Sequence, residues 1–253
     1  MSADLNKTIQ GLWIGPELSL LEQLSISSFL QNGHDYHLYV YDEVKRIPSG
    51  TVIRNANEIL PAARIFQYKH RPSYAGFANH FRYKLLLERG GWWADTDTIC
   101  LKAFDFPEEY VFSSEINHRG VEAVNNGIIK VPPGSSIMTY VSKICENGNP
   151  KRLVWGETGP KLMAKALRKF SFKGYRKSSR VFCPVNYEEW QRVLDPDVEI
   201  SLDDRTFAIH LWNEMWRLAG QDKNAQYDER CLYEKLKRTY LPAAGAVPGF
   251  PKL

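Results

Sequence analysis

Apolar and polar positions follow a regular order in the N-terminal part of the chain, and this order predicts strand, helix and strand. The apolar run 8–14 is ended by a Gly-Pro pair, as a strand followed by a turn would be. Apolar side chains recur at helical spacing over 18–30, and 37–41 forms a second apolar run that acidic residues close. Strand, helix and strand in this order favour a parallel crossover. We therefore predict an α/β sheet with ligands bound beyond the carboxyl ends of its strands.

The next long pattern is a helix that leads into two closely spaced acids. Residues 77–87 contain no helix breaker, and Gly90-Gly91 suits a helix end because glycine adopts left-handed backbone angles without steric cost. The aromatic segment 92–94 favours an extended chain, in which side chains two residues apart point to the same side. Asp95 and Asp97 would therefore lie together. Such carboxylates repel each other unless a cation, usually a divalent metal, lies between them.

Shorter patterns continue to the end of the chain. We predict strands at 98–101, 110–113, 125–131 and 205–212, and helices at 55–60, 135–146, 160–170 and 227–240. Asn125-Asn126-Gly127 is a turn signal that would feed the third of these strands. We expect one domain over 1–240 with small helical additions, and an irregular tail over 241–253, where proline and glycine are frequent.

The composition is that of a soluble globular protein and excludes few functions. Hydrophobic residues make up 43% and charged residues 25% of the 253 positions, which is enough for a sizeable core. The net charge of +4 is too small to indicate nucleic acid as a partner. Tryptophan and tyrosine are numerous, and such aromatics either line sugar and nucleotide clefts or fill the core.

The four cysteines stand far apart, at Cys100, Cys145, Cys183 and Cys231. Without a Cys-x-x-Cys pair they argue against a zinc site and give no disulfide framework. The N-terminus lacks a charged start followed by an apolar run, and no apolar stretch has the length of a membrane span. We therefore expect neither a signal peptide nor a membrane anchor in this chain.

The two acids stand at the end of a longer sequence motif. The chain contains, in order, Ala78-Asn79-x-x-Arg82-Tyr83, Gly90-Gly91, Trp93 and Asp95-x-Asp97. In order and spacing this resembles the conserved core of the DXD-motif sugar transferases. That family includes fungal initiating α-1,6-mannosyltransferases, α-1,4-galactosyl and α-1,4-N-acetylglucosaminyl transferases, bacterial capsule enzymes and, more distantly, the large clostridial glucosylating toxins. The resemblance implies a GT-A-type fold, with a mixed, mostly parallel sheet flanked by helices. Asn79 departs from the pattern, because the family usually has Asp there.

The resemblance also implies roles for individual residues. The implied catalytic residues are Asp95, Asp97, Arg82 and Asn126, and the implied metal ligands are Asp95, Asp97 and His210. The implied donor-binding residues are Trp13, Asn79, Arg82, Trp93, Asp95, Asn125, Gly159 and Trp212. Mn²⁺ is favoured over Mg²⁺ because one of the three ligands is a nitrogen. Trp13, the Asn125-Asn126 pair and His210 keep a second interpretation, as a core aromatic, a hairpin turn and a structural histidine respectively.

These residue types suit the transfer of a sugar from a nucleotide-diphosphate donor. A divalent cation stabilises the charge that the leaving diphosphate gains as the glycosidic bond breaks. The family retains the anomeric configuration, and no carboxylate nucleophile is evident beside Asn125-Asn126, so we favour front-face displacement over a covalent intermediate. We expect a UDP-sugar rather than a GDP-sugar as donor and a glycan or glycolipid as acceptor, in the synthesis of a bacterial surface polysaccharide.

Every charged residue between 161 and 180 is basic. Such a stretch is either a solvated helix face or a surface for an anionic membrane or an acidic glycan. Because no anchor is visible, the sequence indicates a bacterial cytoplasmic enzyme, with peripheral contact at the inner face of the membrane, or else a trimmed chain. It gives no indication of the oligomeric state.

Two other functions fit part of the pattern. Asp95-Thr96-Asp97 also matches the signature of haloacid-dehalogenase-like phosphatases, in which the first Asp is the nucleophile, and Asp203-Asp204 could serve as their late acidic pair. That signature normally follows the first strand and an apolar run, which is not the case here. The second function is a nucleotide-sugar-binding module without turnover, in which Asn79 would mark a decayed catalytic residue.

Overall fold

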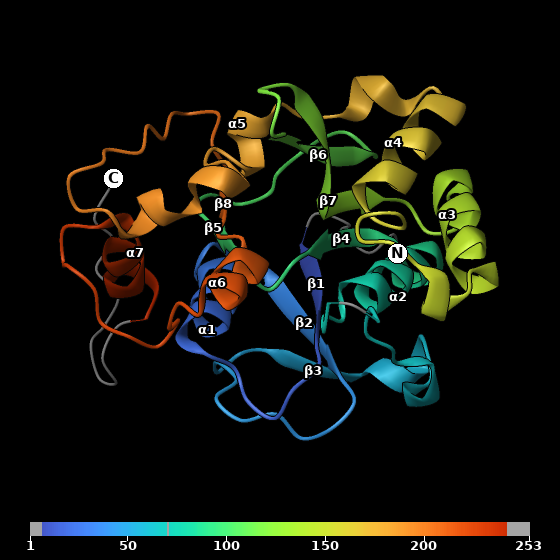
Figure 1. The fold of residues 1–253 in the computed structure, drawn as a ribbon, viewed down its shortest axis with the longest axis horizontal. Helices are drawn as coiled ribbons and strands as arrows, with labels where there is room; N and C mark the ends of the chain where they lie inside the picture. The colour runs from blue at the N-terminus through green and yellow to red at the C-terminus, as the bar shows by residue number, and fades with distance from the viewer. Residues whose placement is uncertain (1–6, 70, 242–253) are drawn as a thin grey trace.

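The computed structural model describes residues 7–69 and 71–241, and a six-stranded sheet forms its centre (Figure 1). The strand order is β3-β2-β1-β4-β7-β6. The strands are β1 (Thr8–Trp13), β2 (Asp35–Val40), β3 (Val52–Asn55), β4 (Gly91–Ala94), β6 (Val111–Ile116) and β7 (Glu122–Val131). The first four are parallel, whereas β7 is antiparallel to both β4 and β6. The predicted mixed, mostly parallel α/β sheet is confirmed.

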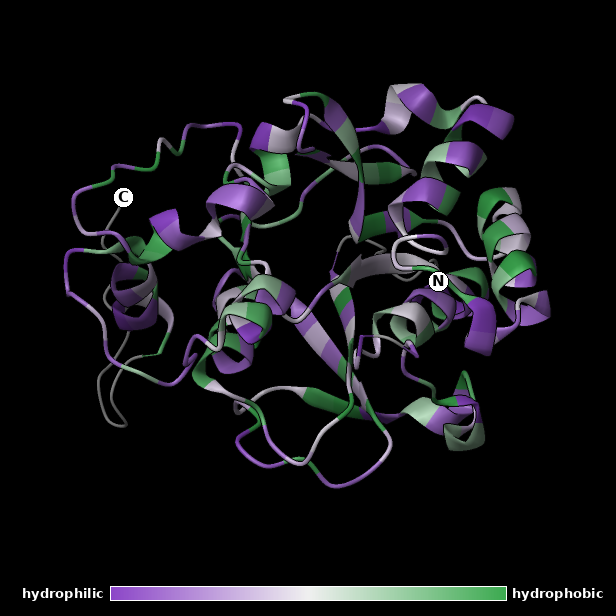
Figure 2. Ribbon diagram, in the orientation of Figure 1, coloured by the Kyte–Doolittle hydropathy of each residue, from purple (hydrophilic) through white to green (hydrophobic). Residues whose placement is uncertain are grey.

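Helices cover both faces of this sheet (Figure 1). The longer helices are α1 (Leu20–Gln31), α2 (Ala75–Arg89), α3 (Ser136–Asn147), α4 (Pro160–Lys169) and α7 (Leu232–Tyr240). Successive side chains of β4 enter two different cores, because side chains alternate along a strand. Trp92 shares a core with side chains of α1 and α7, and Trp93 shares the other with side chains of α2, α3 and α4. Figure 2 shows that polar residues are frequent on the outer helices α4 and α7.

Short elements complete the fold. They are the helices α5 (Ser179–Phe182) and α6 (Asn213–Ala219) and the 3₁₀ segments Ala56–Glu58, Ala62–Arg64, Pro150–Arg152, Phe172–Tyr175 and Tyr187–Leu194. A separate two-stranded sheet pairs β5 (Thr98–Cys100) with β8 (Ala208–His210) in antiparallel register, with Thr98 opposite His210. The Leu211 N–H extends this ladder by donating to the Asp97 carbonyl at 2.9 Å. The pairing therefore brings a late segment of the chain beside the residues that follow β4.

The central segment folds as predicted. α2 runs through the whole predicted helix and ends at Arg89, and Gly90 follows with a φ of 63°, in the region that favours glycine. β4 begins directly after this turn and carries the two tryptophans in extended conformation. The two acids therefore leave the sheet at the carboxyl end of an interior strand.

Two local predictions are wrong, and in both segments an asparagine side chain accepts a hydrogen bond from a nearby backbone N–H. Asn125-Asn126 does not form a turn before a strand but lies inside β7, where the Asn125 Oδ1 accepts a 2.7 Å hydrogen bond from the Gly127 N–H. The predicted helix 55–60 is the end of β3 followed by a single 3₁₀ turn. Its start is capped by the Asn55 side chain, which accepts a hydrogen bond from the Asn57 N–H.

The elements predicted near the C-terminus are too long. Only β8 is extended within 205–212, and Trp212 turns the chain with a left-handed φ of 57°. α7 begins at Leu232 rather than at 227, because the Asp228 side chain accepts a 2.9 Å hydrogen bond from the Arg230 N–H and holds a turn there. The predicted tail 241–253 lies outside the described residues apart from its first position.

Two further features bear on the class of protein. Within residues 7–69 and 71–241, no helix is both long and apolar enough to cross a bilayer. The four cysteines are free thiols, of which Cys100, Cys183 and Cys231 are buried and Cys145 is half-buried.

Candidate active site

The two acids after β4 meet a histidine from the C-terminal part of the chain. β4 is parallel to β1, so the acids leave the sheet at the edge where β1 also ends. The pairing of β5 with β8 places His210 beside them. One ligand atom from each of Asp95, Asp97 and His210 lies within 4.8 Å of the others. These three residues, the Asp95–Asp97–His210 cluster, stand at the edge where α/β sheets bind ligands.

Asp97 is held by two partners from the C-terminal segment. Its Oδ1 lies 3.1 Å from His210 Nε2, and its Oδ2 accepts a 2.7 Å hydrogen bond from the Asn213 N–H. Burial alone would raise the pKa of Asp97, but His210 and the Asn213 N–H outweigh it and lower that pKa. Burial would lower the pKa of His210, but Asp97 and the Cys183 thiol raise it well above its ordinary value. Asp97 and His210 therefore each favour the charged form of the other, and a metal bound here would take His210 as the neutral imidazole.

Asp95 is held from the other side, by α2 and β4. Its Oδ1 accepts a 2.8 Å hydrogen bond from the Trp93 indole N–H and lies 3.0 Å from Arg82 Nη2. Burial raises the pKa of Asp95, and the Arg82 charge opposes the rise. The Oδ2 borders Gly127, where a Cβ would come within 3.0 Å of it. One oxygen is thus fixed by the protein, while the other faces the space left by the absent side chain of Gly127.

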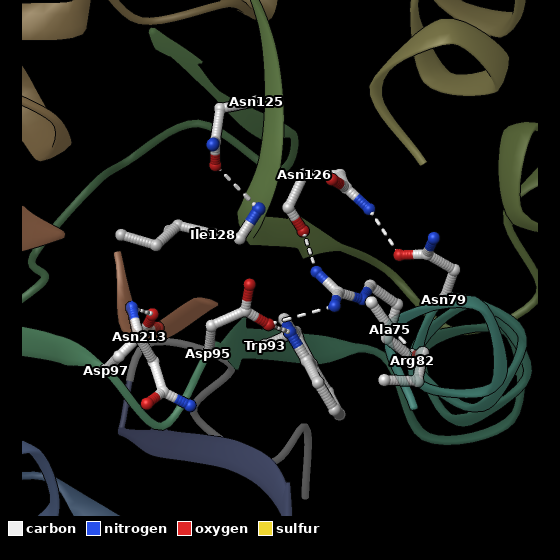
Figure 3. Close-up of polar contacts among 12 residues, drawn as sticks. Ala75, Asn79, Arg82, Trp93, Asp95, Asp97, Asn125, Asn126, Ile128 and Asn213 are labelled. Carbon is white, nitrogen blue, oxygen red and sulfur yellow. Dashed lines mark hydrogen bonds and ion pairs between the residues drawn. The ribbon is translucent and has the colours of Figure 1, made fainter. Parts of the chain in front are cut away.

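Arg82 reaches from α2 across to β4 and β7 (Figure 3). One Nη donates to the Asn126 carbonyl, the other meets Asp95, and the guanidinium carbon lies 4.9 Å from the centre of the Trp93 ring. Arg82 is only 5% exposed. Its planar fork satisfies two acceptors and one ring face at the same time, which a Lys side chain could not do. Arg82 therefore fixes Asp95 relative to β7.

The side-chain amides of Asn79 and Asn126 join α2 to β7 (Figure 3). Asn126 Nδ2 donates a 2.8 Å hydrogen bond to Asn79 Oδ1, and Asn79 Nδ2 lies 3.4 Å from Thr158 Oγ1. Both amides are buried. Gly159 packs against them, since a Cβ there would lie 3.1 Å from Asn79 Nδ2. The loop before α4 therefore closes this wall of the site, and Gly159 is needed for its close approach.

Asn125 connects β7 to an acid on the neighbouring strand. Its Oδ1 accepts a hydrogen bond from the Gly127 N–H, and its Nδ2 donates to Glu115 Oε2, both at 2.7 Å. Burial raises the pKa of Glu115, while Asn125 and His210 oppose the rise. Asn125 therefore connects Glu115 to the part of β7 that borders the cluster.

The predicted aromatic residues lie in three different settings. Trp212 packs on the His210 ring, with centroids 4.0 Å apart, and its indole N–H donates to a backbone carbonyl. Trp93 is 2% exposed and contributes to the site through its indole N–H. Trp13 ends β1 with its ring half-buried, and Lys223 Nζ lies 5.7 Å from the ring centre. Trp93 and Trp212 thus contact the cluster, whereas Trp13 shares only the sheet edge with it.

Several residues around the site were not among the predicted site residues. They are Tyr83, Glu115, Gly127, Thr158, Cys183 and Asn213. Asn213 acts through its backbone and Cys183 lies outside strands, so residue type gave no signal for these two. Glu115 lies two residues beyond the buried Ser113, so it stands on the same face of β6. Glu115 could not be recognised from this alternation, because the strand was predicted to end at residue 113.

The donor set of the cluster fits a divalent cation. Mn²⁺ accepts both carboxylates and an imidazole nitrogen as ligands, whereas Mg²⁺ prefers the carboxylates. Arg82 already pairs with Asp95 at 3.0 Å, and His210 lies 3.1 Å from Asp97. The support for a metal therefore comes from the chemistry and convergence of the three ligands, not from unbalanced charge.

The phosphatase interpretation lacks its second acidic pair. Asp203 and Asp204 are exposed, and the Asp203 carboxylate is bound by Arg205 at 2.6 Å. Neither acid belongs to the cluster that contains Asp95. In addition, one oxygen of Asp95 is occupied by Arg82 and an indole N–H, which does not suit a free nucleophile.

Comparison with known families places two profiles on consecutive parts of the chain. The profile described as "Glycosyltransferase sugar-binding region containing DXD motif" matches residues 20–114. The profile described as "Alpha 1,4-glycosyltransferase conserved region" matches residues 132–246. The first match includes α2, β4 and both acids, and the second includes α4 and His210.

Similar proteins of known activity include two animal α-1,4-glycosyltransferases. The chain is 27% identical over 177 residues to alpha-1,4-N-acetylglucosaminyltransferase of Homo sapiens, a match that covers 64% of this chain and 48% of the relative. It is 24% identical over 103 residues to lactosylceramide 4-alpha-galactosyltransferase of Rattus norvegicus, which covers 35% and 28% respectively. The aligned region thus spans about half the length of the human relative.

Similar solved structures include the PaToxG glycosyltransferase, with a TM-score of 0.47 and 19% identity over 65% of this chain and 69% of that one. The apo form of the glycosyltransferase GlyE of Streptococcus pneumoniae TIGR4 gives a TM-score of 0.39 and 12% identity over 69% of this chain and 45% of that one. Both likenesses are distant and concern overall fold. The chain thus carries a DXD-motif glycosyltransferase sugar-binding region followed, in chain order, by an α-1,4-glycosyltransferase conserved region, and the two together contain both acids and His210.

Proposed function

We propose that the protein transfers a hexose from a nucleotide-diphosphate donor to a glycan or glycolipid, with retention of the anomeric configuration. The observation that carries the proposal is the Asp95–Asp97–His210 cluster, whose ligand atoms converge within 4.8 Å at the ligand-binding edge of the sheet. Retention is supported by the names of the relatives, both of which are α-1,4 enzymes. The preference for a UDP-sugar over a GDP-sugar rests on the resemblance to the family.

The metal assignment follows from the same cluster. Asp95, Asp97 and His210 would hold Mn²⁺ or Mg²⁺, and the bound cation stabilises the negative charge that develops on the diphosphate. The protein prepares this site by fixing both acids. Asp97 is held by the Asn213 N–H, and Asp95 is held by Arg82.

Arg82 is suited to bind the donor as well as Asp95. A guanidinium has five N–H donors, and three of them are directed at Asp95, at the Asn126 carbonyl and at the Ala78 carbonyl. Its remaining donors can contact a phosphate or sugar oxygen while the side chain stays in place. Asn126 holds the arginine through its carbonyl and Asn79 through its amide, so its effect on the donor is one of positioning.

An acceptor with a lipid part would require the enzyme to approach a membrane surface. Within the basic stretch, Arg176 pairs with Glu122 and Lys177 pairs with Glu108, so these two charges are partly neutralised. The exposed basic residues of α4 are Lys161, Lys165, Arg168 and Lys169. We include contact of this helix with an anionic membrane in the proposal, since such clusters are attracted to acidic lipids.

Liposome binding tests this part of the proposal. The double variant Lys165→Gln/Arg168→Gln should bind vesicles of phosphatidylserine and phosphatidylcholine more weakly than the unaltered protein, and neither protein should bind pure phosphatidylcholine. Lys235→Gln/Arg238→Gln is a matched control, because it removes the same charges at the same spacing from α7. Equal binding by both variants and the unaltered protein would remove the membrane contact from the proposal.

The transfer reaction is tested with a donor panel. UDP-galactose, UDP-N-acetylglucosamine, UDP-glucose and GDP-mannose are each incubated with the protein, with Mn²⁺ or with a chelator, and the released nucleoside diphosphate is measured. We expect Mn²⁺-dependent release from a UDP-sugar, and an α-linked product by NMR when an acceptor is present. Binding detected by thermal shift without any release would favour the non-catalytic module, and release of phosphate from simple monoesters would favour the phosphatase.

A further inference from the structure

Glu115 is a carboxylate beside the active site that the proposed reaction does not yet use. It stands on β6, and Asn125 on β7 donates to its Oε2 at 2.7 Å. Asn125 in turn accepts a hydrogen bond from the Gly127 N–H, and Gly127 borders both Asp95 and His210. A continuous row of contacts therefore runs from Glu115 to the Asp95–Asp97–His210 cluster.

Only one oxygen of Glu115 has a protein donor. Within residues 7–69 and 71–241, Asn125 is its hydrogen-bond partner and no Lys or Arg pairs with it. Other enclosed acids of the chain are neutralised by a cation, as Glu22 is by Lys223 and Glu234 by Lys237. The second oxygen is not fully enclosed, so a ligand can reach it and donate a hydrogen bond to it.

Hydrogen-bond acceptors border Gly127, the residue that connects Asn125 to the cluster. A Cβ placed on Gly127 would lie 2.9 Å from Asn125 Oδ1, 3.0 Å from Asp95 Oδ2 and 3.5 Å from His210 Cε1. In Figure 3 the Asn125 and Asp95 side chains lie on two sides of the chain segment that leads to Ile128. Gly127 therefore has no room for a side chain, and its backbone lies directly against these two oxygens. Carboxylate and amide oxygens grouped in this way are suited to a ligand that donates several hydrogen bonds.

We infer that Glu115 binds hydroxyl groups of the transferred sugar through the carboxylate oxygen that Asn125 leaves open. The inference rests on the proposed function, because it supplies a contact for the sugar of the donor. Sugar hydroxyls donate hydrogen bonds, and an ionised acceptor strengthens them. Asn125 is then a positioning residue for Glu115, since both ends of its amide are already bound within the protein. The sugar that this arrangement selects is a neutral, hydroxyl-rich hexose.

Glu115→Gln tests the inference with little change in shape. The Gln oxygen can still accept the hydrogen bond from Asn125, while its amide nitrogen replaces the open acceptor with a donor. Dissociation constants for UDP, UDP-galactose and UDP-N-acetylglucosamine are measured by calorimetry in the presence of Mn²⁺. We expect the affinity for the UDP-sugar that the unaltered protein prefers to fall about tenfold relative to the affinity for UDP, which should not change.

Two further variants separate the sugar contact from a structural effect. Glu109→Gln removes an exposed acid before β6 and should change neither affinity. Glu115→Asp keeps the charge but draws it back by one methylene, so it should weaken UDP-sugar binding, again without affecting UDP, and should unfold at the temperature of the unaltered protein.

Three results would overturn the inference. They are an equal loss of affinity for UDP and for the UDP-sugars, an unchanged ratio of the two affinities, and a glycosyl adduct on Glu115 detected by mass spectrometry, which would make it a nucleophile. If the unaltered protein binds neither UDP nor any UDP-sugar, the proposed function itself fails, and that failure is recognised before any variant is examined.

Discussion

Asn126 donates a 2.8 Å hydrogen bond from its side-chain amide to the side-chain oxygen of Asn79. Position 79 is the one at which the sequence departs from the pattern of related transferases, which usually have Asp. An Asp oxygen would accept the same hydrogen bond, and its second oxygen would face Thr158 Oγ1, a hydroxyl that can donate. The site therefore accommodates either side chain, and the difference lies in a negative charge one helical turn from Arg82.

Asn79→Asp should leave the fold intact and change the reaction. The added charge would attract the Arg82 guanidinium and alter its contacts with the donor. We expect a several-fold change in the ratio of kcat/KM values for UDP-galactose and UDP-N-acetylglucosamine, measured by nucleoside diphosphate release. Rates within twofold of the unaltered protein for both donors would show that the departure at position 79 is neutral. Activity appearing only in the variant would support the interpretation as a decayed module.

Asp97→Asn is the sharpest test of the metal site. The Asn side chain keeps the shape and an oxygen for the Asn213 N–H but loses the charge. We expect Mn²⁺-dependent nucleoside diphosphate release to fall at least about 100-fold, because the cation loses an anionic ligand. Asp97→Ala should in addition lower the free energy of unfolding by about 1–3 kcal/mol, since buried groups lose their partner. Near-normal turnover by Asp97→Asn would contradict the metal assignment.

Arg82→Lys should be far from conservative. A Lys cannot reach the Asn126 carbonyl, Asp95 and the Trp93 ring face together. We expect kcat/KM to fall at least about tenfold and the free energy of unfolding to fall by about 1–3 kcal/mol in urea titrations.

Arg89→Lys at the end of the same helix is the matched control for this change. Arg89 is exposed and pairs with Glu58 at 3.7 Å, so its replacement should alter stability by less than about 0.5 kcal/mol. Equal effects of the two substitutions would show that the planar fork of Arg82 has no special role.

The fold and half of the site could be predicted because their determinants are local. α2, its glycine end and the acids after β4 are encoded within one continuous segment, where helical periodicity and strand alternation are strong. The β7 prediction failed at its start for a non-local reason. Asn125 and Asn126 have the composition of a turn, but the contacts that keep them in the strand come from Glu115 on β6 and Asn79 on α2. No window of sequence contains those partners.

The contact between His210 and Asp97 could likewise not be predicted from a local window of sequence. The sequence places them far apart, and only the resemblance to a family suggested that they meet. The physical cause is the β5–β8 ladder, a pairing of two three-residue strands that neither strand specifies alone. The left-handed turn at Trp212, which brings the Asn213 N–H to Asp97, has no sequence signal, since bulky residues rarely adopt that conformation.

Gly127→Ala should overpack the contact between β7 and Asp95. Its Cβ would come within 3.0 Å of Asn125 Oδ1 and Asp95 Oδ2, and both side chains are held by hydrogen bonds that limit their movement. We expect UDP-sugar affinity to fall at least about tenfold and the free energy of unfolding to fall by about 1–3 kcal/mol, because the contacts around the added methyl group would be overpacked. Gly174→Ala is the control, since a Cβ there meets no atom within 4 Å. Unchanged donor binding by Gly127→Ala would place the sugar elsewhere.

Stability should also depend on pH through His80, which lies on α2 next to Asn79. Burial, with smaller effects of Arg64 and Lys84, lowers the pKa of His80 to about 4, although Glu146 opposes the shift. In the unfolded chain a histidine titrates near pH 6.5. Between these two values the unfolded state binds more protons than the folded state, so acid favours unfolding there. The contribution of His80 to stability is therefore present above about pH 6.5 and is lost as the pH falls towards 4.

His80→Gln should remove this part of the pH dependence. In urea titrations between pH 7 and 4, the unaltered protein should lose about 1–2 kcal/mol more stability than the variant, because partial access of water to the ring reduces the full linkage value. Carboxylates titrate in the same range, but they contribute to both proteins and cancel in the difference. His118→Gln changes an exposed histidine and should reproduce the curve of the unaltered protein. Parallel curves for His80→Gln and the unaltered protein would mean that the folded protein accepts the His80 proton as readily as the unfolded chain does.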